Sequence, residues 1–156
     1  MPVLQPSLTK SNRCNEEPPL KKLLLIAPAL AIVLVGCTTT QVDPDLAEPV
    51  LSKVSADCPR EGPVSKITVT RDTGFIGSAL DHRIYLDGKE AARLRPGQKV
   101  TMCVDASDDH YINVDCFGCI PHTIDIRPKA NVEKLIRTGG NQGGLYAAPH
   151  GNVPMK

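Results

Sequence analysis

Short runs of alternating polar and apolar residues fill the chain from residue 64 onward. Residues 66–70, Lys-Ile-Thr-Val-Thr, show the pattern most clearly. A period of two is typical of a β-strand with one face buried and the other in water. The same pattern predicts further strands at residues 83–86, 90–94, 99–104, 111–116, 122–126, 132–137 and 144–147.

Turn sequences separate these runs. Asp87 and Gly88 predict a two-residue hairpin, in which both residues adopt positive φ. Residues 95–98, Arg-Pro-Gly-Gln, predict a type II turn, because proline presets φ and glycine takes the left-handed position. Turns recurring about every ten residues, with no long helical period, predict an all-β fold. We expect a small β-sandwich or open barrel of about seven short antiparallel strands.

Three short motifs also suggest a family. Residues 74–78 (Gly-Phe-Ile-Gly-Ser), the hairpin at 84–89 and the turn at 94–98 resemble a group of small uncharacterised bacterial lipoproteins with a PEGA-like β-sandwich domain. The resemblance covers roughly residues 67–114. Because its motifs are turns and hairpins, it implies a fold more than a function.

The N-terminal region has the parts of an export signal. Lys21 and Lys22 precede an apolar stretch, residues 23–35, which is shorter than the roughly 20 residues of a membrane-spanning helix. Residues 34–37, Leu-Val-Gly-Cys, resemble the lipobox of bacterial lipoproteins. That resemblance implies cleavage between Gly36 and Cys37, with acyl chains such as palmitate on Cys37.

We therefore divide the chain into three parts. Residues 1–36 form a precursor segment with the signal peptide, of which 1–19 indicate a start site assigned too far upstream. Residues 37–63 hold the lipidated cysteine and a tether, since four prolines interrupt any helical pattern. Residues 64–156 form the β-sandwich domain. Beyond Cys37 the chain carries 14 Lys and Arg against 15 Asp and Glu, which argues against nucleic-acid binding.

Four cysteines remain for the exported part, and an even number in an oxidising compartment predicts structural disulfides. Cys58 with Cys103 and Cys116 with Cys119 is one pairing; Cys103 with Cys116 is also sterically reasonable. The pairing stays open at this point.

Two chemical alternatives use the same residues. A thiol-redox site at Cys116 and Cys119 requires a helix N-terminus to lower the thiol pKa, whereas the pattern places a strand before the motif. A zinc site from the four cysteines and His122 requires reduced thiols. Ser78 lacks the Gly-x-Ser-x-Gly context of a hydrolase nucleophile.

The sequence thus predicts a non-catalytic envelope lipoprotein that binds or scaffolds, with neither a cofactor nor a resident metal. The expected partner is another envelope protein or a cell-wall glycan. Thr38 after the lipidated cysteine implies, for a Gram-negative source, sorting to the periplasmic side of the outer membrane. The alternative is a periplasmic thiol-redox or metal-handling protein that uses Cys116 and Cys119.

Overall fold

The structure is a computed structural model that describes residues 39–54, 58, 62–74, 79–141 and 144–155. The export signal, Gly36, Cys37 and most of the 74–78 motif lie outside these residues. The described chain contains strands and turns but no helix, and therefore no helix able to span a membrane.

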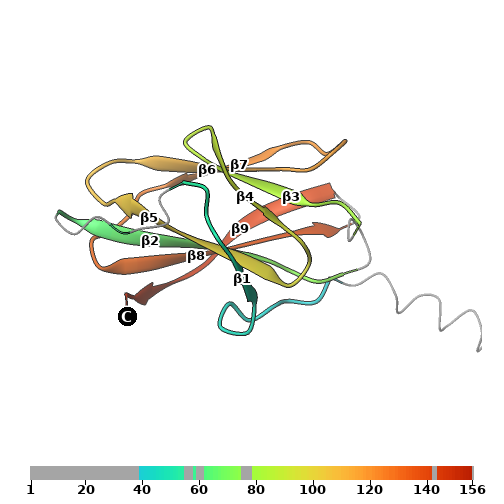
Figure 1. The fold of residues 1–156 in the computed structure, drawn as a ribbon, viewed down its shortest axis with the longest axis horizontal. Coiled ribbons are helices and arrows are strands. Elements are labelled where there is room, and N and C mark those ends of the chain that lie inside the picture. The colour runs from blue at the N-terminus through green and yellow to red at the C-terminus, as the bar shows by residue number, and fades with distance from the viewer. Residues whose placement is uncertain (1–38, 55–57, 59–61, 75–78, 142–143, 156) are drawn as a thin grey trace, which may run out of the picture. The chain divides into compact units, whose positions relative to one another are not determined.

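Nine strands form two sheets that face each other (Figure 1). The five-stranded sheet has the order β1-β5-β2-β8-β9 and the four-stranded sheet the order β4-β3-β6-β7. The strands are β1 (Glu48–Val50), β2 (Val64–Arg71), β3 (His82–Leu86), β4 (Lys89–Leu94), β5 (Gln98–Asp105), β6 (His110–Asp115), β7 (His122–Ile126), β8 (Val132–Asn141) and β9 (Gly144–Pro154). The predicted all-β sandwich is confirmed.

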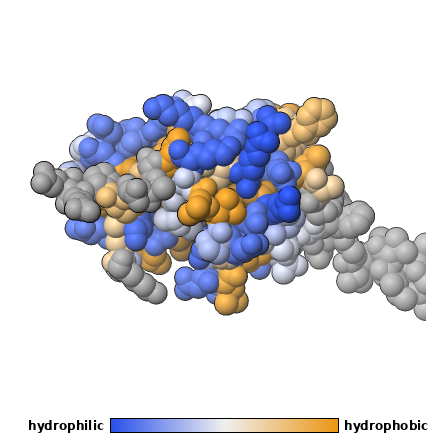
Figure 2. Space-filling model, in the orientation of Figure 1, coloured by the Kyte–Doolittle hydropathy of each residue, from blue (hydrophilic) through white to orange (hydrophobic). Residues whose placement is uncertain are grey.

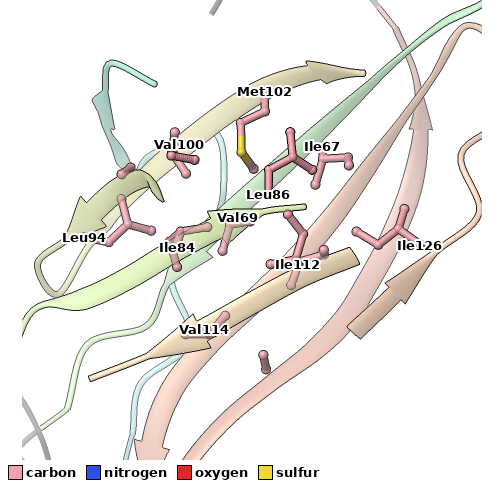
Figure 3. Packing of buried hydrophobic residues seen from close by; sticks show 14 of the residues in the cluster. Ile67, Val69, Ile84, Leu86, Leu94, Val100, Met102, Ile112, Val114 and Ile126 are labelled. Carbon is pink, nitrogen blue, oxygen red and sulfur yellow. The ribbon is translucent and has the colours of Figure 1, made fainter. Parts of the chain in front are cut away.

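The predicted alternation produces the core. The apolar positions of β2 and β5 point toward those of β3 and β6, as Figure 3 shows for Ile67, Met102, Ile84 and Ile112. These side chains are fully buried. The polar positions of the same strands face away from the core, so the hydrophobic effect fixes which face of each strand is inside.

Both predicted turns are confirmed. Asp87 and Gly88 have φ values of 49° and 78°, as the tight hairpin requires. Gly97 has a φ of 82°, and the Gln98 N–H donates to the Arg95 carbonyl over 3.1 Å. The chain therefore reverses at the two positions that the sequence marks.

The prediction of purely antiparallel strands is wrong in two places. β2 pairs with β8 in parallel, and β1 pairs with β5 in parallel. The reason is that the chain passes between the sheets, so β2 and β8, like β1 and β5, are neighbours in the sheet but distant in sequence. No hairpin then dictates their relative direction.

β1 is also a strand that the alternation does not predict, and it lies in the segment expected to be a tether. Glu48 to Val50 pair with the first residues of β5. Farther on, the Lys53 N–H donates to the Ala91 carbonyl of β4 over 2.7 Å, and its ammonium pairs with Glu90. The described residues 39–54 therefore pack on the domain, and the five-stranded sheet includes three of them.

Both sheets meet at one end, which we name the Thr39 end: β2, β4, β6 and β8 finish there. Arg71 at the close of β2 crosses between the sheets, where its Nη1 donates to the Leu94 carbonyl over 2.6 Å. His82 crosses from the other side, with its Nδ1 3.2 Å from the Thr138 hydroxyl. These two buried contacts fix the sheets against each other at this end.

The environment of His82 predicts a pH dependence. Burial, followed by the nearby charge of Arg71, lowers the pKa of His82 to about 4. The folded state therefore binds fewer protons than the unfolded state between about pH 6.5 and pH 4. The contribution of buried, neutral His82 to the free energy of unfolding should be present near neutral pH. It should be lost as the pH falls through that window.

His82→Asn should abolish this part of the pH dependence, because asparagine does not titrate. Urea unfolding measured at several pH values tests this. His122→Asn is the matched control, since His122 is exposed on β7, and it should retain the wild-type pH profile. Identical profiles for wild type and His82→Asn would show that burial of His82 does not control the response.

Candidate functional site

The outer face of the five-stranded sheet carries a buried carboxylate just beyond β2. Asp72 follows Arg71, which points into the sandwich, so its own side chain points outward by the alternation of the strand. Its carboxylate is nevertheless fully buried. A charge buried on an outer face requires both a cover and partners.

Three donors surround this carboxylate. Arg137 of β8 contacts both oxygens, with its Nε 3.1 Å from Oδ1 and its Nη2 on Oδ2. The Tyr146 hydroxyl of β9 donates to Oδ2, and the Val42 N–H donates to Oδ1 over 2.9 Å. Burial, followed by the hydrogen bond to Asp72, raises the pKa of Tyr146 to about 12, so its hydroxyl remains a donor at neutral pH.

The donor from Val42 shows what covers the carboxylate. We name residues 39–47 the strap, since they cross the outer face of the sheet. The Thr39 hydroxyl donates to the Gly140 carbonyl over 2.6 Å, and Thr40 and Thr73 exchange two backbone hydrogen bonds. The strap is therefore fixed at the Thr39 end by Thr73, just beyond β2, and by Gly140 of β8, only two residues after Cys37.

Tyr146 lies across Gly139, which has no side chain to occupy the space of its ring. A Cβ on Gly139, its cross-strand partner, would lie 2.5 Å from the Tyr146 hydroxyl oxygen. The ring cannot move aside without breaking its bond to Asp72. The predicted strand over residues 132–137 stops short of Gly139, which the structure places within β8, and no sequence motif marks Asp72.

The predicted cysteines occupy two separate places. Cys58 and Cys103 lie at disulfide distance with Cα atoms 4.9 Å apart, as do Cys116 and Cys119 with Cα atoms 5.2 Å apart. The first pair is on the outer face of β5, away from the Thr39 end, and the second is in the loop after β6, at the Thr39 end. The structure thus adopts one of the two pairings left open.

Two features of the structure bear on the thiol-redox and metal alternatives at Cys116 and Cys119. Cys116 follows a strand and begins a turn closed by the Cys119 N–H and the Cys116 carbonyl, 3.0 Å apart. This is not the helix N-terminus at which a redox cysteine has a lowered pKa. Among the described residues, no three His, Cys, Asp or Glu side chains gather in a way that would hold a metal ion.

Shallow hollows on the described surface include two near the sheets' polar faces. One of about 190 Å³ lies against the strap, over Thr68, Thr101 and Glu133, whose side chains are hydrogen-bonded to one another. The other, of about 240 Å³, lies beside Tyr111 and Arg127. Both are smaller than the roughly 300–1,000 Å³ of typical small-molecule sites.

No protein-family model, curated protein or solved structure matches this chain.

The burial and the partners of Asp72 predict that replacing its carboxylate strongly destabilises the fold. Asp72→Asn keeps the size of the side chain but leaves Arg137 buried without its carboxylate, which should lower the free energy of unfolding by about 3–5 kcal/mol. Urea denaturation measures this change. Amide hydrogen exchange at Val42 should also accelerate, because its acceptor loses its charge.

Asp109→Asn is the matched control. Asp109 forms an exposed ion pair with Arg127, so its loss should change stability by no more than about 0.5 kcal/mol. If Asp72→Asn and Asp109→Asn behave alike, the carboxylate does not hold the strap.

Proposed function

We propose that this chain is the precursor of a bacterial lipoprotein, exported, cleaved before Cys37 and held at a membrane by acyl chains on that cysteine. The observation that carries the proposal is Leu-Val-Gly-Cys at residues 34–37, directly after two lysines and a short apolar stretch. Two or three acyl chains anchor a soluble domain stably, at about 0.8 kcal/mol for each buried methylene.

The contacts of Thr39 support this proposal. Thr39 already contacts the sheet, and the strap continues from it without interruption to β1. The proposed cleavage site therefore lies two residues before a segment that is hydrogen-bonded to the sheet. Cleavage before Cys37 would leave these contacts of the strap intact.

The domain itself is proposed to be a non-catalytic module that binds or scaffolds. Its described surface offers strand faces, strand edges and shallow hollows, which are suited to contact with a macromolecule over an area. The partner class is another envelope protein or a cell-wall glycan. In a Gram-negative cell, Thr38 after the anchor implies the periplasmic side of the outer membrane.

The alternative function is thiol-redox or metal-handling chemistry at Cys116 and Cys119. What favours it is that this loop is exposed and its Cys119 is only half-buried, so a reductant or a metal reaches it. A structural pair resists mild thiol reductants, whereas a catalytic pair is reduced readily.

Intact mass of the protein extracted from host membranes tests both proposals. We expect a chain that begins at Cys37 and carries two or three acyl chains. Four thiols should become available to an alkylating reagent only after reduction. Cys37→Ser should accumulate as the uncut precursor without acyl mass.

An unmodified Cys37 would overturn the lipoprotein proposal. Labelling of Cys116 and Cys119 without prior reduction would favour the redox or metal alternative instead.

A further inference from the structure

The loop between β6 and β7 exposes two large hydrophobic side chains. Phe117 is 80% exposed and Ile120 is 87% exposed. Figure 2 has the orientation of Figure 1, and one of the hydrophobic areas visible in it lies where Figure 1 shows the loop between β6 and β7. The six residues 116–121, Cys-Phe-Gly-Cys-Ile-Pro, contain no charged side chain.

The same loop is built to hold its shape. Cys116 and Cys119 lie at disulfide distance on either side of Phe117 and Gly118. Gly118 has a φ of 76°, and the Cys119 N–H closes the turn on the Cys116 carbonyl. The two hydrophobic side chains therefore project from a turn with little conformational freedom to lose on binding.

Exposed hydrophobic side chains are common singly, so exposure alone identifies no partner. The position of this loop supplies the second observation. Arg83 at the start of β3 pairs with Asp115 at the end of β6, so the loop lies at the Thr39 end. It shares that end with Gly140 and Thr73, which fix the strap.

The reach of the chain connects this end with a membrane. Cys37 is two residues before Thr39, and two residues span at most about 7 Å. Acyl chains on Cys37 enter the hydrocarbon region of a bilayer. Since Thr39 and Thr40 are fixed to the sheet, lipidation of Cys37 would place the bilayer surface beside the Thr39 end.

We infer that Phe117 and Ile120 contact the lipid bilayer when Cys37 is lipidated, so that the loop between β6 and β7 is a second membrane contact. The inference rests on the proposed function. The anchor supplies most of the affinity, and the loop sets the orientation of the domain on the surface. The outer face of the four-stranded sheet and the opposite end of the domain then remain available to a partner.

The chain offers a clean spectroscopic test, because it contains no tryptophan. Phe117→Trp places a single tryptophan in the loop without disturbing the core, since Phe117 is exposed. Tyr111→Trp is the matched control, because Tyr111 is also exposed but lies at the start of β6, at the opposite end of the domain. Both variants are made in the full chain and purified in lipidated form from membranes.

The probe is a phosphatidylethanolamine–phosphatidylglycerol vesicle in which part of the lipid carries brominated acyl chains. The Phe117→Trp variant should show blue-shifted emission that brominated lipid quenches and aqueous iodide does not. The Tyr111→Trp variant should show the reverse. Iodide quenching of both variants would overturn the inference. Shielding of the Phe117→Trp variant from iodide, without quenching by brominated lipid, would also overturn it, in favour of a protein contact.

The mass of each sample separates this result from the proposed function. If Cys37 carries its acyl chains and brominated lipid does not quench the Phe117→Trp variant, the loop contact is wrong and the lipoprotein proposal stands. If Cys37 is unmodified, both fail together.

Discussion

The hydrogen bonds and the ion pair of the buried Asp72 carboxylate are the interactions on which the rest of this arrangement depends. A buried charge destabilises a fold unless its partners replace the lost water. Here Arg137, Tyr146 and the Val42 N–H do so from β8, β9 and the strap. One side chain thereby joins two strands of the sheet to the segment that covers it, and the cover in turn keeps water from the charge.

The strap determines how the domain is connected to whatever precedes it. With the Thr39 hydroxyl bound to Gly140 and Val42 bound to Asp72, the chain is already attached to the sheet two residues after the proposed lipidation site. β1 and the contact of Lys53 with β4 continue the attachment toward the opposite sheet. If Cys37 is lipidated, these contacts make the orientation of the domain a property of the fold, and the loop that carries Phe117 is directed to the same side.

The sequence predicted what short-range patterns control. Alternation identified the strands from β2 to β9, and the turns at Gly88 and Gly97 followed from the need for positive φ. β1 was not predicted, because its three residues, Glu-Pro-Val, show no period. They form a strand because they pair with β5. The parallel pairing was not predicted either, because it depends on how the chain passes between the sheets.

The site around Asp72 was harder to predict for a related reason. The partners of Asp72 lie 30, 65 and 74 residues away in sequence, so no local motif marks it. The cysteine pairing likewise depended on register, which places Cys103 on the outer face of β5 and Cys116 at the Thr39 end.

Neutron reflectometry of the lipidated protein on a supported bilayer tests whether the strap holds the domain directly against the proposed lipid anchor on Cys37. We expect protein density to begin within roughly 10 Å of the headgroups, since Thr39 is the second residue after Cys37. A hydrated gap of about 25–30 Å, the span of a flexible chain over residues 38–63, would contradict it.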